Sequence, residues 1–321
     1  MNKDISGKHL LTIVVPVHNR AEMAVCTLDS IADSSCKAFN LIIVDNASTD
    51  GTMEVCQQWA LRHSFEEFEV TVVEETKSGA PAARNRGLSL CQTPYIYFFD
   101  SDDLFDSQFI AEMLYSIQDC TDQPDMVFVP VQQQQGKAIR TRSYKLHASP
   151  HEHILNAMLC TPSMLFRTAW LRQLGGWNEE LTIWQDWELG LRVLLAKPNI
   201  LWTQKPYHTI LIHPNSITGK SYSLRLSSIV NTLEHALIAI DSSIADKSLK
   251  AKCKRTLLIR TKIIAGKMAL EGNTEACHQL AQWAKTAIDN QPLRTHIIAN
   301  LLQRYSSLGG RAAWRIGIAM C

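Results

Sequence analysis

The chain has 321 residues, of which 46% are hydrophobic and 20% charged, and its 32 Lys and Arg residues nearly balance 31 Asp and Glu residues. These values exclude a disordered, collagen-like or coiled-coil protein, and the net charge of +1 argues against a nucleic-acid binder. The charge is unevenly spread, however. Residues 1–218 hold 17 basic and 25 acidic residues (net −8), whereas residues 219–321 hold 15 and 6 (net +9). We therefore expect an acidic body joined to a basic tail.

Nine cysteines are scattered along the chain without a Cys-x-x-Cys pair, a pattern that favours reduced thiols in a cytosolic protein. An apolar run of about seven residues ends at Pro16 and indicates a buried strand rather than a signal peptide. No stretch approaches the roughly 20 apolar residues of a membrane span. We expect a cytoplasmic protein, at most peripheral at the inner face of the membrane.

Strands and helices alternate over the first hundred residues. Continuous β-branched or apolar runs predict strands at 10–17, 41–44, 70–73 and 95–99, and helical spacing predicts helices at 21–32, 52–62 and 80–90. Such alternation predicts an α/β fold with a mostly parallel sheet and helices on both faces. Ligands of these sheets bind at the carboxyl ends of the strands, so polar residues at those ends are candidates for function.

The second half is mixed at first and then entirely helical. It predicts strands at 126–131, 163–166 and 207–213, an exposed hairpin or loop at 132–145, and helices at 152–159, 169–174 and 184–196. Further helices are expected at 224–240, 248–270, 275–290 and 293–307. We therefore expect two domains, residues 1–219 and a helical C-terminal extension at 220–321.

A cluster of carboxylates, Asp100, Asp102 and Asp103, follows the strand expected at 95–99. Clustered carboxylates repel one another unless a cation lies between them, and Mg²⁺ or Mn²⁺ prefers carboxylate oxygens together with substrate phosphates. A solvated turn is the alternative interpretation of such a cluster when it stands alone.

The cluster does not stand alone. The sequences VVPVHNR at 14–20, IVDNASTDGT at 43–52 and GAPAARNRG at 79–87 precede FFDSDD at 98–103. With these motifs in this order, about residues 10–215 resemble the family 2 glycosyltransferases of the GT-A fold. The resemblance implies an inverting enzyme that uses a nucleotide-sugar and Mn²⁺ or Mg²⁺.

The resemblance also implies roles for particular residues. Asp45 would contact the nucleotide base or ribose, and the forked guanidinium of Arg84 suits a pyrophosphate. Asp100 and Asp102 would hold the metal, and His213, after the last expected strand, is either a further ligand or a structural histidine. The nucleotide-sugar would lie against Pro16, Val17, His18, Asn19, Arg20, Asp45, Arg84, Asp100, Ser101 and Asp102.

The sequences GGWNE at 175–179 and WQDWEL at 184–189 resemble the acceptor region of the family. Asp186 matches the carboxylate that takes the proton from the acceptor hydroxyl. Gln185 departs from the Glu of many members, and we expect Glu188 to pair with Arg192 at i+4. Trp184 and Trp187 would stack on acceptor sugars or belong to the core.

The predicted activity is transfer from a UDP-sugar to a hydroxyl of a glycan or lipid-linked acceptor. Two alternatives stay open, a nucleotidyltransferase that acts on sugar phosphates and a non-catalytic nucleotide- or glycan-binding module. A Rossmann dehydrogenase is disfavoured because no GxGxxG follows the first strand.

The basic tail has two interpretations, a dock for an anionic membrane or a solvated face packed on the acidic body. Its cations gather at Lys247, Lys250, Lys252, Lys254, Arg255, Arg260, Lys262 and Lys267, and Arg311 and Arg315 accompany apolar Leu308, Trp314, Ile316 and Ile318.

Overall fold

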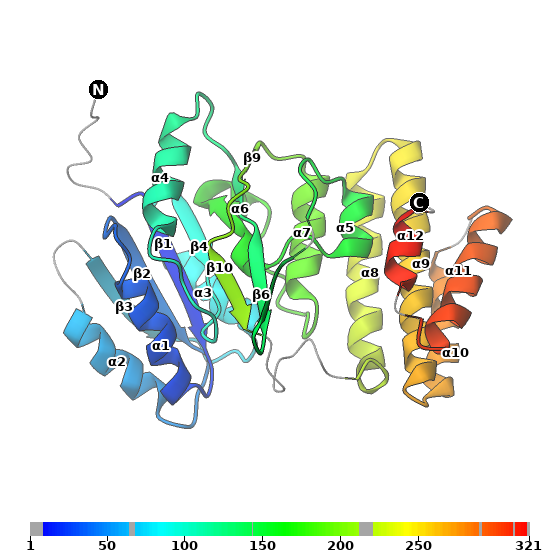
Figure 1. Cartoon of the computed structure of the whole chain (residues 1–321), viewed down its shortest axis with the longest axis horizontal. Helices are drawn as coiled ribbons and strands as arrows, with labels where there is room; N and C mark the ends of the chain where they lie inside the picture. Colours follow the sequence, from blue (N-terminus) through cyan, green and yellow to red (C-terminus); the bar gives the residue numbers. More distant parts are fainter. Residues whose placement is uncertain are drawn as a thin grey trace. The chain divides into compact units, whose positions relative to one another are not determined.

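The computed structural model describes residues 9–63, 68–142, 144–211, 221–288, 291–310 and 312–319 (Figure 1). The chain forms two compact units. The first holds residues 1–142, 160–179 and 198–213, and the second holds 143–159, 180–197 and 214–321. The expected domain boundary near residue 219 lies outside the described residues. The two units also differ from the two expected domains, because two segments of the body pack with the C-terminal helices.

The first unit is built on a seven-stranded sheet with the strand order β3-β2-β1-β4-β8-β5-β9. All neighbours are parallel except β8, which runs antiparallel to both β4 and β5. This arrangement confirms the mostly parallel α/β fold. The strands are β1 (Leu11–Val17), β2 (Phe39–Asp45), β3 (Phe68–Glu74), β4 (Tyr95–Phe98), β5 (Met126–Phe128), β8 (Met164–Arg167) and β9 (Ile200–Trp202).

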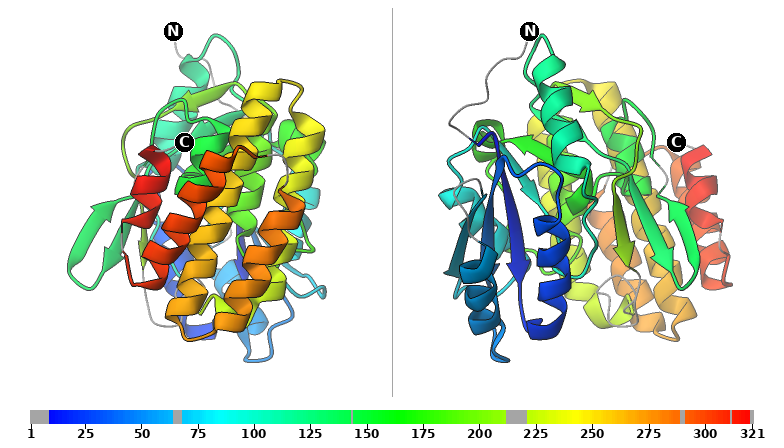
Figure 2. Two further views of the ribbon diagram at one scale, coloured as in Figure 1. Left: turned by 90° about the vertical axis from the view of Figure 1, so that its right-hand side faces the viewer. Right: turned by 60° about the vertical axis from the view of Figure 1, so that its left-hand side comes forward.

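Helices cover both faces of this sheet. Alternate residues of β1, such as Ile13 and Val15, join one core cluster with residues of α1 (Ala21–Ala32), α2 (Thr52–His63) and α4 (Phe109–Asp119). Val14 points to the opposite face, where a Cβ added to Gly87 would lie only 2.4 Å from it. Glycine at this position therefore lets α3 (Ala80–Leu90) approach the sheet closely (Figure 2).

A second, three-stranded sheet has the order β10-β6-β7, with β6 and β7 forming an antiparallel hairpin. The hairpin is mostly exposed, as expected for residues 132–145, and turns at Gly136 with a φ of 58°. The first unit also contains the short helix α6. These elements are β6 (Val131–Gln135), β7 (Ala138–Thr141), β10 (His208–Leu211) and α6 (Thr168–Gln173).

The second unit is helical and its core surrounds α9. Helix α11 packs so closely on α9 that a Cβ on Gly266 would lie 2.2 Å from the carbonyl oxygen of Gln303. Helices α5 and α7 of the body join this core, and α12 adds a helix that the periodicity did not predict. The helices are α5 (Pro150–Asn156), α7 (Gln185–Leu195), α8 (Leu226–Ser243), α9 (Lys247–Leu270), α10 (Thr274–Ala287), α11 (Leu293–Ser307) and α12 (Ala313–Ala319).

Among the described residues, no helix has both the length and the apolar character needed to cross a membrane.

Candidate active site

The turns that follow β1 and β2 are tied to each other by polar contacts. Asn19 has a left-handed φ of 49°, and its backbone N–H donates to Ser48 Oγ at 2.9 Å. Its side-chain oxygen accepts from the Thr49 backbone N–H at 2.8 Å. His18 Nδ1 lies 2.7 Å from the carbonyl oxygen of Asn46. The motifs at 14–20 and 43–52 therefore form one rigid edge of the sheet.

Asp45, the last residue of β2, is almost fully buried beside this edge. Its Oδ2 accepts a hydrogen bond from the Ser48 backbone N–H at 3.0 Å, whereas its buried Oδ1 has no hydrogen-bond partner among the described residues. Because an unpaired buried acceptor costs free energy, this oxygen favours a donor supplied by a ligand. Pro16 and Val17 are buried strand residues, so any contact they make with that ligand involves their main chain.

Asn46 holds the segment before α3, a role that the sequence did not reveal. Its side-chain amide donates to the carbonyl oxygens of Glu75 at 3.0 Å and Lys77 at 2.7 Å. Its side-chain oxygen accepts from the Gly79 backbone N–H at 2.7 Å, where the chain turns with a φ of 121° to begin α3. One side chain thus links the end of β2 to the start of the helix that carries Arg84.

Arginines contact the two aspartates expected to hold the metal. The buried Arg84 guanidinium lies 2.6 Å from Asp100 Oδ1 and 4.4 Å from the ring centre of Trp177. Arg20 NH2 lies 3.1 Å from Asp102 Oδ2. The Nε of Arg84 is buried without a partner within the described residues. Guanidinium groups therefore gather at the same place as carboxylates, as a site for a diphosphate and a cation requires.

Asp103 differs from the other two aspartates. It is buried, and its Oδ1 accepts from the Leu211 backbone N–H at 3.0 Å. Burial, together with the charges of Asp100 and Asp102, raises the pKa of Asp103 to about 8. Asp103 is therefore mainly protonated at neutral pH and joins the turn after β4 to β10.

The oxygen donors of Asp100 and Asp102 suit Mg²⁺ or Mn²⁺, which commonly take one or two carboxylates and complete their shell with water and substrate phosphates. No group of three or more His, Cys, Asp or Glu side chains that could enclose an ion is found among the described residues. Two carboxylates, from Asp100 and Asp102, are a donor set that fits an ion shared with substrate phosphates. His213 and Lys220 lie outside the described residues.

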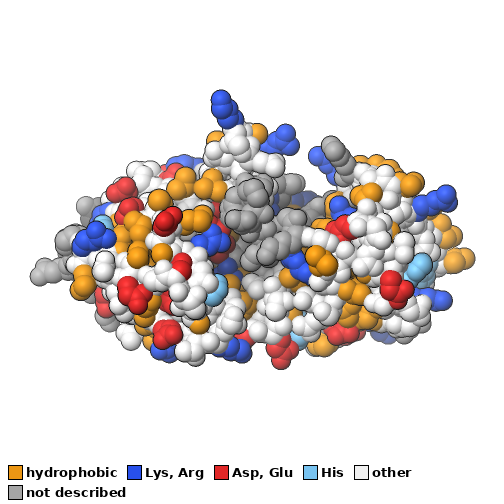
Figure 3. Space-filling view, turned by 90° about the horizontal axis from the view of Figure 1, so that it is seen from below, with side chains coloured by type: hydrophobic (Ala, Val, Ile, Leu, Met, Phe, Trp, Pro, Cys, Tyr) orange, Lys and Arg blue, Asp and Glu red, His pale blue; other side chains and the backbone are white. Residues whose placement is uncertain are grey.

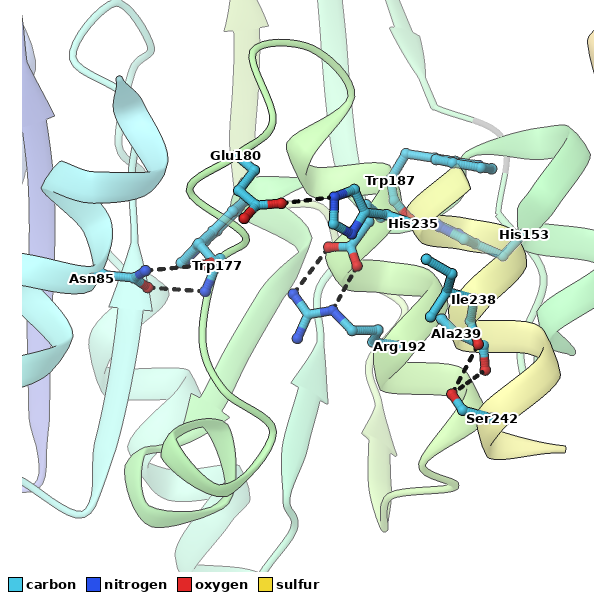
Figure 4. Close-up of polar contacts among 11 residues, drawn as sticks. Asn85, His153, Trp177, Glu180, Trp187, Arg192, His235, Ile238, Ala239 and Ser242 are labelled. Atoms are coloured by element: carbon cyan, nitrogen blue, oxygen red, sulfur yellow. Dashed lines mark hydrogen bonds and ion pairs between the residues drawn. The ribbon is translucent and has the colours of Figure 1, made fainter. Parts of the chain in front are cut away.

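The turn at 175–177 positions Trp177 beneath Arg84. The side-chain amide of Asn85 donates to the Trp177 carbonyl oxygen at 2.9 Å and accepts from the Trp177 N–H at 2.9 Å (Figure 4). Asn85 also donates to Glu179, which lies 2.6 Å from Lys77 Nζ. A Cβ on Gly176 would be only 2.6 Å from Asn85 Oδ1, so the contact requires glycine there.

In the second unit, Asp186 lies in the first turn of α7, and its Oδ1 accepts a hydrogen bond from the Trp187 N–H at 2.8 Å. The buried Glu188 forms the expected pair with Arg192, with N–O distances of 2.7 and 3.0 Å (Figure 4). The expected pair is therefore confirmed, and Asp186 is the acidic side chain of this turn that does not take part in it.

Arg260 of α9 is buried among the tryptophans of the second unit. Its guanidinium carbon lies 4.7 Å from the ring centre of Trp184 and 4.6 Å from that of Trp187, and its Nη1 donates to the Ile154 carbonyl oxygen at 2.9 Å. Burial lowers its pKa to about 10, and the Asp186 carboxylate acts in the opposite direction. Arg260 therefore carries a positive charge at neutral pH.

These contacts bear on the two interpretations of Trp184 and Trp187, which are sugar stacking and a place in the core. Trp187 is buried in the helical core beside His153, which favours a core role over sugar stacking. The stacking role of the partly buried Trp184 stays a prediction. Arg260 therefore does not belong to a solvated basic face. Helix periodicity alone could not show that the tryptophans cover this side chain.

In the described part of the chain, the first unit holds Asp45, Arg84, Asp100 and Asp102, and the second holds Asp186 with Trp184 and Trp187. Residues 12–175 match Glycosyl transferase family 2, which is half of the chain, so the protein belongs to the family 2 glycosyltransferases. Its fold is the GT-A fold.

Individual relatives are more distant. The amylovoran biosynthesis glycosyltransferase AmsB of Erwinia amylovora is 33% identical over 127 residues, which is 40% of each protein. The chain therefore spans about two fifths of that relative. Among solved structures, residues 1–349 of S. aureus TarS in complex with UDP-GlcNAc have a TM-score of 0.71 and 17% identity, with 96% of this chain and 90% of that TarS chain covered.

A second fold relative is the mannosyltransferase PcManGT from Pyrobaculum calidifontis, in complex with GDP-Man and Mn²⁺. It has a TM-score of 0.57 and 17% identity, with 98% of this chain and 87% of PcManGT covered. At these identities the two structures show a shared fold and do not identify the substrates.

Proposed function

We propose that the protein is an inverting, metal-dependent glycosyltransferase that transfers a hexose from a UDP-sugar to a hydroxyl of a glycan or lipid-linked acceptor. The observation that carries the proposal is the pairing of Asp100 with Arg84 and of Asp102 with Arg20, in the same unit where Asp45 has a buried oxygen without a partner among the described residues. This set contains the donors and acceptors that a nucleoside diphosphate and its cation need.

In the proposed donor site, Asp45 Oδ1 accepts a hydrogen bond from the base or ribose. Arg84 and Arg20 bind phosphate oxygens, for which the guanidinium geometry is suited. Asp100 and Asp102 would hold Mn²⁺ or Mg²⁺, which supplies positive charge against the departing diphosphate. The UDP-GlcNAc bound to TarS agrees with a UDP-sugar and the Mn²⁺ bound to PcManGT agrees with a metal, whereas the nucleotide-sugar of PcManGT is GDP-Man.

The proposed acceptor chemistry belongs to Asp186. Its carboxylate takes the proton of the acceptor hydroxyl while that oxygen forms a bond to the anomeric carbon. The bond from this carbon to the diphosphate breaks, and its electron pair leaves with UDP. A single displacement of this kind inverts the anomeric configuration.

Incubation of the full chain with individual UDP-sugars and Mn²⁺ tests the proposal through the release of UDP. We expect at least one UDP-sugar to be turned over, with loss of turnover in EDTA. Pyrophosphate release from UTP and a sugar 1-phosphate would instead establish a nucleotidyltransferase. Binding of UDP without turnover of any donor, with all acceptor classes supplied, would support a non-catalytic module.

A further inference from the structure

Helix α11 has two apolar sides, and only one of them is used by the core. The inner side buries Ala299, Leu302 and Ser306, with Ser306 Oγ donating to the Ile263 carbonyl oxygen at 3.0 Å. The outer side exposes large apolar side chains at spacings of three or four residues. These are Leu293 (76% exposed), Ile297 (51%), Leu301 (62%), Tyr305 (41%) and Leu308 (78%).

This spacing places the five side chains in a continuous stripe along one side of the helix. Single exposed apolar residues are ordinary on protein surfaces, but a contiguous stripe usually marks an interaction site. Helix α11 lies on the surface of the helical unit in Figure 2 (left), and hydrophobic side chains also reach the surface of this unit at the right of Figure 3.

The charged side chains of α11 and α12 have one sign. Arg294 and Arg304 are exposed on the same side of α11, and Arg315 is exposed beside Ile316 on α12. Neither helix contains an Asp or Glu. We call this surface, formed by the outer side of α11 with Arg315 and Ile316, the α11 face.

The dense basic run of α9 lacks this character. Lys254 Nζ lies 2.8 Å from Asp241 Oδ1, Lys250 contacts the same carboxylate at 3.9 Å, and Arg260 is buried. Lys250 and Lys254 thus share one carboxylate, and Arg260 is not accessible to a ligand. The exposed apolar stripe with exposed arginines beside it belongs to α11 and α12.

We propose that the α11 face docks on an anionic phospholipid surface. The apolar stripe would enter the boundary between headgroups and acyl chains, while the arginines extend to lipid phosphates. A second copy of the chain fits less well. A two-fold contact between two α11 faces would bring arginines together without a carboxylate from either copy. The charge on this face thus favours lipid over self-association.

Flotation of the full-length protein with phosphatidylcholine vesicles, with and without phosphatidylglycerol, tests the proposal. We expect binding only to the anionic vesicles, with weakening as salt is added. Replacement of both Ile297→Ser and Leu301→Ser should lower the partition coefficient roughly tenfold or more, because two buried apolar side chains are lost. Arg294→Gln with Arg304→Gln should lower it about tenfold.

The matched control is Ile238→Ser, which alters an equally exposed side chain on α8 of the same unit and should leave vesicle binding unchanged. Circular dichroism and turnover of the donor check that all variants fold. Equal binding to neutral and anionic vesicles, or no binding at low salt, would overturn the proposal. Sedimentation showing a dimer that Ile297→Ser with Leu301→Ser dissociates would also overturn it, in favour of self-association.

Discussion

The two compact units use charged side chains in different ways. In the first unit, two arginines contact two aspartates at the ends of buried strands, and a carboxylate oxygen of Asp45 has no partner within the described chain. In the second, Arg260 is covered by tryptophan rings, and Glu188 is fully engaged by Arg192. The contrast indicates that contacts with a ligand can replace the ion pairs of the first unit. Most charged groups in the core of the second unit have a structural role.

Asp186 is the proposed exception in the second unit, and its removal should have the largest effect. Asp186→Asn keeps the size of the side chain but cannot take a proton, so we expect kcat to fall about a thousandfold. The affinity for UDP with Mn²⁺, measured by calorimetry, should not change, because the proposed nucleotide residues belong to the first unit. Retained transfer, or a loss of UDP binding, would remove Asp186 from its role as base.

Asp102→Ala tests whether the first unit binds the nucleotide through a metal. We expect the affinity for UDP with Mn²⁺ to fall roughly a hundredfold, to the value that the unaltered protein shows in EDTA. Calorimetry of both proteins with and without EDTA provides the measurement. If the unaltered protein binds UDP equally well in EDTA, the two aspartates do not hold a metal for the nucleotide.

Asn85→Ala tests whether the turn beneath Arg84 holds Trp177 in the position that donor binding requires. Loss of the side-chain hydrogen bonds to Trp177 and Glu179 should lower the free energy of unfolding by about 2–3 kcal/mol and raise the KM for the donor. The neighbouring Arg86→Ala is the matched control, because Arg86 is exposed. Its effect on stability should stay within about 0.5 kcal/mol. An unchanged donor KM in Asn85→Ala would leave this residue a purely structural role.

Arg260→Lys tests whether stacking, rather than charge alone, stabilises the second unit. Lysine keeps the charge but cannot stack a planar group on Trp184 and Trp187, so we expect the free energy of unfolding to fall by about 1–2 kcal/mol. Urea denaturation followed by tryptophan fluorescence measures this change. A variant as stable as the original chain would show that the rings only fill space around a cation.

The smallest expected effect concerns the pH dependence of stability and arises from His208 in the first unit. It is buried among aromatic rings, and burial lowers its pKa from 6.5 to about 3. The unfolded chain therefore takes up a proton below pH 6.5 that the folded chain refuses until about pH 3, and stability falls as the pH falls through this range. Between pH 7 and pH 5.5 this loss is about 1 kcal/mol.

His208→Leu should remove that component of the pH dependence, as measured by denaturation at both pH values. His278→Asn, at an exposed position, should leave it in place. The same pH dependence in His208→Leu as in the original chain would show that other groups cause the acid sensitivity.

Much of the first unit could be predicted from the sequence because its signals are local. The β-branched run of β1 and the polar residues that follow each strand indicate both the sheet and the edge where ligands bind. The segment Ile200–Trp202 was missed as a strand, since three half-buried residues form no recognisable run. The seven residues of α12 were also not predicted as a helix.

The partners of the site residues could not be predicted in the same way. Asp45, Arg84 and Asp100 were identified from motifs, but the link from Asn85 to Trp177 joins positions 92 residues apart. Arg260 was grouped with surface cations because its sequence neighbours are basic, and only packing against Trp184 and Trp187 shows that it is buried. Contacts of this kind depend on tertiary structure and leave no periodic signal.

A thermal-shift screen of nucleotide-sugars with Mn²⁺ tests the central claim, that the first unit binds a UDP-sugar through a metal, most directly. Ligands that bind only the folded state raise its stability, by about 2.7 kcal/mol at a hundred times Kd. The account predicts a raised Tm with UDP-sugars and Mn²⁺, with no rise in EDTA or in Asp102→Ala. A rise with a different nucleotide and none with UDP-sugars, or an equal rise in EDTA, would contradict it.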